Sequence, residues 1–346
     1  MNTWIVLLLA GVGVWVSWQG GAAIGFWPAL GLMAISFVIL AKSADWLVDG
    51  AIEIAQKLHA PPILIGIVIV GIGTTAPELA VSVTAALQDK AGMALGNAVG
   101  SVIYDDGLAL PLAILLAPVP ILIEKRVLKA AAIFLIVIDL LAYAMAWDGV
   151  LSRGNGLVLV GCFVGYLLYT YWDQKRSPKP LDLEEAEEGA GTLGMTLFFV
   201  GGLVGVLASS HWIVQATPAV GRQLGIPDEV VALVLVALGT SIPEVATCII
   251  AARKGAGSLA VGNILGADIL NICWIAGASA VANPLKVSTD VINFMFPAML
   301  IVVLSMLALM FHGYKLEKWK GGVLLGLCAA YLVAVYVFNP GAIQVH

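Results

Sequence analysis

Two short segments place oxygen-bearing side chains in the middle of long apolar runs. GTTAPE occupies positions 73–78 and the related GTSIPE occupies 239–244. Each segment combines hydroxyl groups, a proline and one glutamate, Glu78 or Glu244. The proline removes a backbone donor, so we expect a helix break that frees backbone carbonyls one turn earlier. Carboxylate, hydroxyl and carbonyl oxygens together form a hard ligand set suited to Na⁺ or Ca²⁺.

The expected ligands come in two matching sets. The first copy supplies the Gly71 carbonyl and the side chains of Thr74, Thr75 and Glu78. The second copy supplies the Ala237 carbonyl and the side chains of Thr240, Ser241 and Glu244.

A second pair of segments accompanies the first pair. GNAVGSVIYD at 96–105 corresponds to GNILGADILN at 262–271. Their glycines are four residues apart, which is typical of close contacts between membrane helices, and we expect the asparagine after the first glycine to hydrogen-bond within the bundle. Ser101 and Asp105 are also four apart and share one helix face. Asp105 is thus a third carboxylate at membrane depth, and its counterpart is Asn271.

Other acidic residues have simpler interpretations. A carboxylate inside a membrane is costly and usually functional, and no Lys or Arg lies in these four spans away from their ends. Asp139 stands alone, and we expect it to make structural or helix-end hydrogen bonds. Asp106 and Asp268 neighbour the cluster, but we expect them to point elsewhere. The acids of the amphipathic stretch 42–58 are expected at the membrane interface; they are Asp45, Asp49 and Glu53.

The composition is that of a polytopic membrane protein. The 346 residues are 61% hydrophobic and only 11% charged, with a mean hydropathy of +1.00, whereas soluble domains carry about 25% charged residues. The four cysteines lie in apolar stretches and lack disulfide or metal-site spacing. No basic run or nucleic-acid-binding module is present. We therefore expect no cofactor, no nucleic-acid partner and no obligate protein partner, only the lipid bilayer and transported ions.

The apolar runs predict eleven spans, each near the 20 residues needed to cross the hydrocarbon. The first run is either a retained helix or a signal peptide. It has no basic leading segment and no clear cleavage site, which favours a retained helix. The predicted spans are 3–19, 24–42, 61–87, 93–117, 129–147, 155–172, 191–211, 227–253, 258–281, 291–311 and 320–338.

The last ten spans form an internal repeat. A shift of 166 residues aligns the halves without a gap, with 12 identities in 33 positions from 73 to 105. Each half holds five spans, and an odd number predicts that the second copy enters the membrane from the opposite side, as in many secondary transporters. The predicted fold is all-α, with two inverted five-helix repeats. The parts are an extra N-terminal helix (1–22), the first repeat (23–172), a polar linker (173–190) and the second repeat (191–346).

Loop charges predict the orientation. With the linker in the cytoplasm, thirteen Lys and Arg residues fall on the cytoplasmic side and four on the other: Lys90, Arg153, Arg222 and Lys286. Such an excess marks the cytoplasmic side. It predicts a plasma (inner) membrane protein with its C-terminus outside.

The paired motifs resemble the two alpha-repeats of the calcium/cation antiporter superfamily, in particular its prokaryotic sodium/calcium exchanger branch. The resemblance covers about residues 24 to 338. It implies a transporter that is not an enzyme, with ten core helices and ions bound at the midplane, exchanging one Ca²⁺ for about three Na⁺. Glu78 and Glu244 would be the carboxylates shared by both ions. The carbonyls of Thr74 and Thr240 would complete the Ca²⁺ site. Sodium would use the hydroxyls of Thr75, Ser241 and Ser101 with the carbonyls of Gly71 and Ala237. Asp105 and Asn271 would occupy the remaining positions of the central ion site.

Two departures from the family pattern leave the driving ion open. The acid and the amide are exchanged between the repeats, with Asp105 in the first and Asn271 in the second. The position equivalent to Ser101 is Ala267, so a hydroxyl ligand for sodium is missing. The alternatives are therefore Ca²⁺/H⁺ exchange, a K⁺ co-ion, or another divalent metal such as Mn²⁺. An intramembrane hydrolase fits less well, because the chain has no polar segment that would bring water and substrate to an acid pair. A channel is a further alternative, which saturable flux that depends on a counter-ion would exclude.

Overall fold

The structure is a computed structural model that describes residues 25–58, 62–176, 192–223 and 239–338. The predicted N-terminal helix at 1–22, most of the linker at 173–190, and Ala237 lie outside the described residues. The all-α prediction is confirmed, because helices account for nearly all of the described chain.

The helices of the first half include a break in the predicted span 61–87 and π-helical turns (η) in the predicted spans 61–87 and 93–117. They are α2 (Phe26–Lys57), α3 (Pro62–Ile65), η2 (Gly66–Val70), α4 (Gly71–Thr74), α5 (Ala76–Leu87), α6 (Ala91–Tyr104), η3 (Asp105–Ala109), α7 (Leu110–Leu116), α8 (Lys125–Ala146) and α9 (Arg153–Arg176).

The second half follows the same plan. Its described helices are α10 (Thr192–Gln223), α12 (Ile242–Arg253), α13 (Gly257–Ile269), η5 (Leu270–Ala276), α14 (Gly277–Ala282), η6 (Val291–Met295), α15 (Phe296–Phe311) and α16 (Lys318–Phe338).

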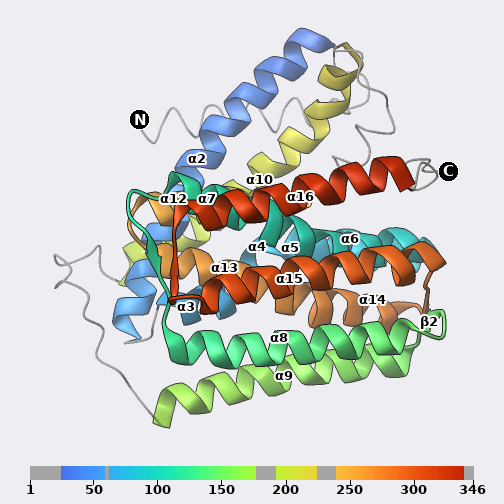
Figure 1. Ribbon diagram of the computed structural model, residues 1–346. Helices are drawn as coiled ribbons and strands as arrows, with labels where there is room; N and C mark the ends of the chain where they lie inside the picture. Colours follow the sequence, from blue (N-terminus) through green and yellow to red (C-terminus); the bar gives the residue numbers. More distant parts are fainter. Residues whose placement is uncertain (1–24, 59–61, 177–191, 224–238, 339–346) are drawn as a thin grey trace.

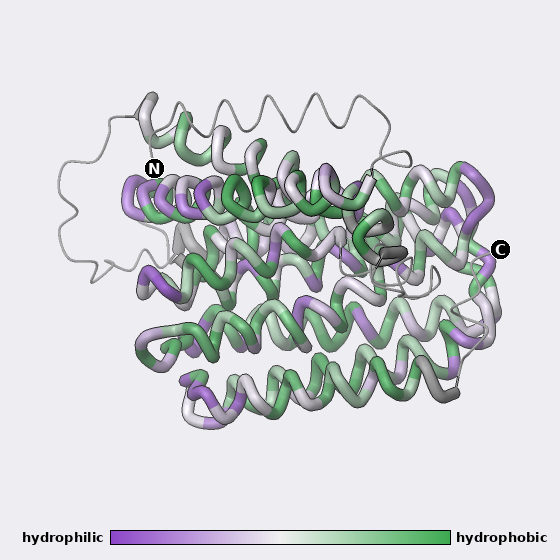
Figure 2. The backbone as a smooth tube through the Cα atoms, turned by 90° about the horizontal axis from the view of Figure 1, so that it is seen from above, coloured by the Kyte–Doolittle hydropathy of each residue, from purple (hydrophilic) through white to green (hydrophobic). Residues whose placement is uncertain are grey.

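Long apolar helices make this a multi-pass membrane protein. Eight helices in the described residues are long and apolar enough to span a membrane, or nine if the bent pair Ile63–Thr74 and Ala76–Leu87 counts as one span. These nine match nine of the predicted spans. A tenth prediction, 227–253, is described only from residue 239. Figure 2 shows hydrophobic residues along most of the bundle, with hydrophilic residues gathering toward its two ends.

The second span is longer than predicted. We expected an apolar span at 24–42 followed by a separate interfacial stretch, but α2 is one continuous helix of 32 residues. At 1.5 Å per residue it extends about 48 Å, well beyond the 30 Å hydrocarbon core. Its polar end therefore continues out of the membrane without a break.

Helices α2 and α10 pair closely and stand together at one side of the bundle (Figure 1). Glycines permit this contact. A Cβ atom at Gly202 would lie 2.4 Å from the backbone nitrogen of Leu47, and one at Gly50 would lie 2.6 Å from that of Phe199. Real Cβ atoms do not approach this closely, so larger residues there would push the two helices apart.

Two short antiparallel strand pairs join the halves, and the sequence analysis did not predict them. β1 (Ile121–Leu122) pairs with β4 (Lys315–Leu316), and β2 (Val150–Leu151) pairs with β3 (Leu285–Lys286). Each pair takes one strand from each half. The pairs lie at opposite ends of the bundle (Figure 1). At each end, a strand of the first half is therefore hydrogen-bonded to a strand of the second half.

The predicted glycine contacts are confirmed for the second repeat. A Cβ atom at Gly262 would lie 2.0 Å from the Ile63 carbonyl oxygen, and one at Gly266 would lie 2.4 Å from that of Ile67. Helix α13 thus packs backbone to backbone on the α3–η2 segment. The equivalent partners of Gly96 and Gly100, near residues 229 and 233, lie outside the described part of the chain.

Candidate ion-binding site

Each PE motif begins a new helix at a break. Thr75 has a ψ of 7°, and α5 starts at Ala76. The axis of the helical segment Ile63–Thr74 differs by 47° from that of Ala76–Leu87. In the second half Ser241 has a ψ of 3°, and α12 starts at Ile242. Proline is favoured in the first turn of a helix, where no backbone donor is needed. The motif therefore places a glutamate, Glu78 or Glu244, in the first turn of a helix within the membrane region.

One detail of the predicted break is wrong. The Gly71 carbonyl is not freed, because it accepts hydrogen bonds from the Thr75 backbone N–H (3.0 Å) and the Thr75 hydroxyl (2.9 Å). Pro77 lacks the N–H that would bond four residues back, to Gly73. A cation at Gly71 or Thr75 would have to share oxygens that already take part in these bonds.

The two glutamates are buried together with Asp105. None is more than 1% exposed, and Glu78 interacts electrostatically with both Glu244 and Asp105. All four glutamate oxygens lack a hydrogen-bond donor among the described residues. Asp105 Oδ2 accepts one bond of 3.4 Å from Asn271 Nδ2, so two residues that are equivalent in the repeat contact each other across the halves.

Threonine and asparagine side chains cross-link the two motifs. The Thr74 hydroxyl donates to Asn263 Oδ1 at 3.3 Å, and the Thr240 hydroxyl donates to Asn97 Oδ1 at 3.2 Å. These bonds are related by the 166-residue repeat. The hydroxyls also lie beside the carboxylates of the opposite half, Thr240 next to Glu78 and Thr74 next to Glu244. The hydrogen bonding predicted for the two asparagines is confirmed.

The asparagines also hold the helix that carries each glutamate. Asn97 Nδ2 donates to Ser82 Oγ at 2.9 Å and to the Glu78 carbonyl at 3.3 Å. Asn263 Nδ2 contacts Cys248 Sγ, the equivalent of Ser82, at 3.5 Å. A thiol is a weaker acceptor than a hydroxyl, so the first-repeat anchor is the stronger one.

π-helical turns position the other two predicted ligands, Asp105 and Asn271. Asp105 begins η3 and Asn271 lies in η5. A π-turn adds one residue to the helical repeat and is frequent at functional sites. Ser101 precedes η3 by one turn and Ser241 lies at the second break. Both hydroxyls are buried. The Ser101 hydroxyl has no hydrogen-bond partner in the described part of the chain, and the Ser241 hydroxyl lies beside Asp105.

In this conformation the site does not form a compact metal cage. Among the described residues, no three acidic, histidine or cysteine side chains lie within range of one metal ion. The hydroxyls of Thr74 and Thr75 both bond to carbonyls of their own helix. Eight of the predicted ligands are buried: Glu78, Glu244, Asp105, Asn271, Thr74, Thr240, Ser241 and Ser101. An ion would therefore bind to one or two of these carboxylates together with neutral oxygens.

One further acid, Asp139, was misjudged from the sequence. The direction predicted for Asp106 and Asp268, away from the cluster, stays a prediction, and the two carboxyl groups interact with each other. Asp139 lies seven residues before the end of α8, and its oxygens have no hydrogen-bond partner among the described residues. The signal that identified Glu78, an acid in an apolar run without a base, is present for all three.

A cavity of about 440 Å³ lies beside the break in the first half. Among the described residues, its walls include Pro77 of α5, Ser210 and His211 of α10, and Thr240. The cavity therefore lies between α10 and the two PE motifs.

Comparison with known proteins agrees with this arrangement. A solved structure of the sodium-calcium exchanger NCX_Mj superimposes with a TM-score of 0.77 at 27% identity, covering 90% of this chain and 98% of that one. The sodium/calcium exchanger MaX1 of Methanosarcina acetivorans is 28% identical over 343 residues, which covers 88% of this chain and 97% of MaX1.

Two further observations place the chain in a family. The inner membrane protein YrbG of Escherichia coli is 30% identical over 321 residues, covering 90% of this chain and 98% of YrbG. The family model described as sodium/calcium exchanger protein matches twice, at 28–172 and at 194–337, once in each repeat. The chain is therefore a member of the sodium/calcium exchanger family of membrane cation antiporters.

Proposed function

We propose that the protein exchanges Ca²⁺ for Na⁺ across the membrane by alternating access, with Glu78 and Glu244 as ligands shared by both ions. The observation that carries this proposal is the burial of Glu78, Glu244 and Asp105, which interact electrostatically and have no basic partner among the described residues. Isolated carboxylates in a low-dielectric interior are very costly, so a cation is the natural counter-charge.

Competition for the same oxygens would couple the two ions. Ca²⁺ needs six to eight oxygen ligands and usually more than one carboxylate. Sodium ions at the same carboxylates would supply comparable charge, so Ca²⁺ and Na⁺ would not bind to the site at the same time. An empty site would leave buried carboxylates uncompensated, which disfavours crossing without cargo. Because only the ion-loaded protein would change its access from one side to the other, each Ca²⁺ that crosses would be exchanged for Na⁺.

The neutral ligands follow from the same geometry. Thr74, Thr240, Ser241 and Ser101, with Asn271, would complete the coordination of Ca²⁺ or Na⁺ around the carboxylates. The carbonyls of Gly71 and Ala237, with Thr75, are the remaining proposed sodium ligands. Ala237 is outside the described residues, and Gly71 and Thr75 would have to loosen their mutual hydrogen bond.

Movement of α2 and α10 would expose the site alternately. These two helices pack chiefly on each other, and α10 lines the cavity that reaches Pro77 and Thr240. The inverted repeat predicts that they move as a pair against the four site segments. We place the linker in the cytoplasm and the C-terminus outside, in a plasma (inner) membrane.

The test is ⁴⁵Ca²⁺ uptake into vesicles that contain the purified protein. Sodium, potassium and proton gradients are imposed one at a time. An outward Na⁺ gradient should drive uptake, and a Glu78→Gln variant should abolish it. Absence of Ca²⁺ flux under any Na⁺ gradient would refute the proposal.

The alternative is Ca²⁺/H⁺ or K⁺-dependent exchange by the same fold. The observation in its favour is Ala267, which is completely buried and stands where the first repeat has Ser101. The alanine side chain has no oxygen, so the second repeat lacks a hydroxyl ligand at this position. Uptake that follows a pH gradient in Na⁺-free buffer, or that requires K⁺, would establish this alternative.

A further inference from the structure

An apolar groove runs between α8 and α9, which lie side by side at the edge of the bundle (Figure 1). Its volume is about 470 Å³. The residues that line it on α8 include Ala130, Ile133 and Val137, and those on α9 include Cys162, Gly165 and Tyr169. Both sets follow the spacing i, i+3, i+7, so each helix turns one continuous face toward the groove. From Ala130 to Val137 the groove extends about 10 Å along the helix.

The groove has a closed floor and an open side. Phe134 and Tyr166 line it and stack on each other with ring centroids 4.5 Å apart, and Tyr166 is buried. On the open side Ile133 is 65% exposed and Tyr169 is 52% exposed. A Cβ atom at Gly165 would meet no atom of the described residues within 4 Å. Because α8 and α9 are both long enough to span the membrane, this open side faces the lipid.

Basic residues gather at one end of the groove. Helix α8 begins and α9 ends at the same end of the bundle (Figure 1). Arg126 precedes Ala130 by four residues and Lys129 precedes Ile133 by four, so both lie one turn beyond the groove. These two helix ends carry five basic residues and only two acids. The basic residues are Lys125, Arg126, Lys129, Lys175 and Arg176, and the acids are Glu124 and Asp173.

Lys129 is available to a partner from outside the described chain. Its side chain is exposed and forms no hydrogen bond or ion pair with the described residues. Lys125, by contrast, lies 4.7 Å from the ring centroid of Tyr314. Trp172, near the end of α9, is 59% exposed. Exposed Trp and Tyr side chains at a helix end are typical of the depth at which lipid headgroups lie.

We propose that the α8–α9 groove binds one anionic phospholipid, with an acyl chain against Gly165 and the phosphate beside Arg126 and Lys129. The order of the two parts, apolar at membrane depth and basic at the surface, matches the order of chain and headgroup. Basic pockets between membrane helices are known to bind anionic headgroups, and hydrogen bonds from Arg or Lys to phosphate are strengthened by charge.

Charge also separates this occupant from two others. A neutral phospholipid could fill the groove with the same chains, but its headgroup carries no net charge to match the basic end. A second copy of the chain, in the same membrane orientation, would bring its own basic end to the same depth, where like charges repel. None of the proposed ion ligands lies on α8 or α9, so the lipid site is separate from the ion site.

The test is native mass spectrometry of the purified full-length protein with equal amounts of dioleoyl phosphatidylglycerol and dioleoyl phosphatidylcholine. The wild type should bind one phosphatidylglycerol about tenfold more often than one phosphatidylcholine. Replacing both Arg126→Gln and Lys129→Gln should bring the two lipids close to equal binding. Gly165→Leu should reduce the binding of both lipids by about threefold or more, because the added side chain occupies the space of the acyl chain.

Two matched variants control for charge and bulk. Lys318→Gln removes an exposed lysine that follows β4, the strand paired with β1 just before α8, so it lies at the same end of the bundle. Gly326→Leu adds the same bulk at another open glycine, on α16. Neither variant should change lipid binding. An unchanged Tm in phosphatidylcholine shows that each variant is folded, and the exposed Arg126 and Lys129 positions decide the question if Gly165→Leu does not fold.

Three results would overturn the site. They are equal binding of the two lipids by the wild type, a full preference in the Arg126→Gln, Lys129→Gln variant, and a loss of preference in Lys318→Gln as large as in that variant. A dimer that Gly165→Leu converts to a monomer without changing lipid binding would identify a second copy as the occupant, which also overturns it. All of these measurements are made without an ion gradient, so their failure is distinguishable from failure of the proposed exchange.

Discussion

The Thr240 hydroxyl donates a 3.2 Å hydrogen bond to Asn97, and Thr74 donates the equivalent 3.3 Å bond to Asn263 in the other half. Each bond joins the break of one repeat to the glycine-rich helix of the other. The two halves of the site are thus positioned by each other. A substitution at one of these asparagines should therefore also shift the glutamate of the other repeat.

Asn97→Ala should impair ion binding more than Asn263→Ala. Asn97 contacts Thr240, Ser82 and the Glu78 carbonyl, whereas Asn263 contacts Thr74 and a weakly accepting thiol. At about 1 kcal/mol per lost hydrogen bond, the Ca²⁺ half-saturation constant should rise roughly tenfold or more for Asn97→Ala. ⁴⁵Ca²⁺ binding to both variants measures the difference. Equal effects would show that the extra Asn97 contacts do not position Glu78.

Glu244→Gln should abolish Ca²⁺ binding and stabilise the ion-free protein. The amide keeps the shape of the side chain but removes a buried charge that has no donor among the described residues. We expect at least about a 100-fold loss of affinity, or about 2.8 kcal/mol. Thermal unfolding in chelator should show a higher Tm than wild type. Asp148→Asn, at an exposed position, is the control and should leave both quantities unchanged; a lower Tm for Glu244→Gln would contradict the argument.

Ala267→Ser should strengthen sodium binding. The side chain is completely buried in α13, one turn before Asn271, and serine restores the hydroxyl that Ser101 supplies in the first repeat. One added oxygen ligand should lower the Na⁺ concentration that half-displaces ⁴⁵Ca²⁺ by about three- to tenfold, about 0.7–1.4 kcal/mol. Ala260→Ser, also in α13, is the control for the added bulk. An unchanged Na⁺ dependence would favour the proton-driven alternative.

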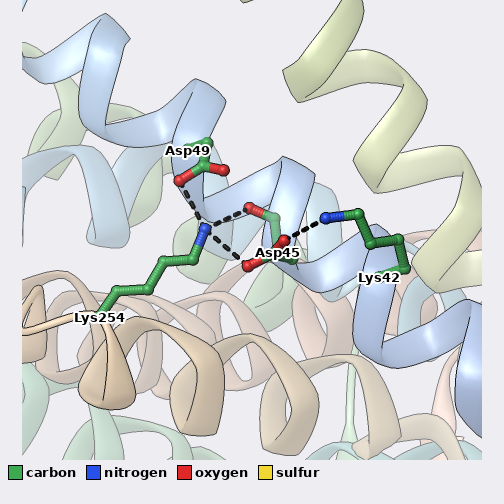
Figure 3. Close-up of polar contacts among 4 residues, drawn as sticks. All are labelled: Lys42, Asp45, Asp49 and Lys254. Atoms are coloured by element: carbon green, nitrogen blue, oxygen red, sulfur yellow. Dashed lines mark hydrogen bonds and ion pairs between the residues drawn. The ribbon is translucent and has the colours of Figure 1, made fainter. Parts of the chain in front are cut away.

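The contacts of Lys254 should affect turnover more than affinity. Lys254 follows α12 and pairs with Asp45 at 2.7 Å and Asp49 at 2.6 Å on α2, and Lys42 pairs with Asp45 (Figure 3). These groups are partly exposed, so each pair is worth only about 0.2–1 kcal/mol. If α2 moves against α12 during transport, Lys254→Gln should change the maximal rate about two- to fivefold.

The Ca²⁺ half-saturation constant of Lys254→Gln should stay near that of the wild type, because the contacts lie away from the buried carboxylates. Uptake rates measured over a range of Ca²⁺ concentrations separate the two quantities. Lys318→Gln, an exposed lysine at the start of α16, is the matched control. A change in affinity without a change in rate would exclude a role in helix movement.

Lys320→Met should lower stability without changing ion selectivity. The buried ammonium donates to three carbonyls around the end of α15, and a buried acceptor left unpaired costs about 1–3 kcal/mol. The methionine fills similar space, so the loss reflects the hydrogen bonds. We expect a lower Tm for Lys320→Met and little change for Lys318→Met. A Tm equal to wild type would mean that water satisfies these carbonyls.

The sequence by itself determined the elements and the chemical composition of the site. The length of the apolar runs predicts the spans, because lipid requires about 20 apolar residues per crossing. The repeated PE motifs predict where the helices break, since proline is tolerated only where its missing donor is not needed. The equivalence of Asp105 and Asn271 also followed from the repeat, whereas the hydrogen bond between them did not.

Only the tertiary structure decided which side chains meet. The crossed bonds from Thr240 to Asn97 and from Thr74 to Asn263 join residues 143 and 189 positions apart, and helical periodicity says nothing about contacts at such distances. The π-turn that begins at Asp105 shifts the face that follows it, so a regular 3.6-residue repeat cannot place Asp106 correctly. The interaction of Asp106 and Asp268 with Asp139 on α8 depends on how three helices pack, which is a property of the folded bundle alone.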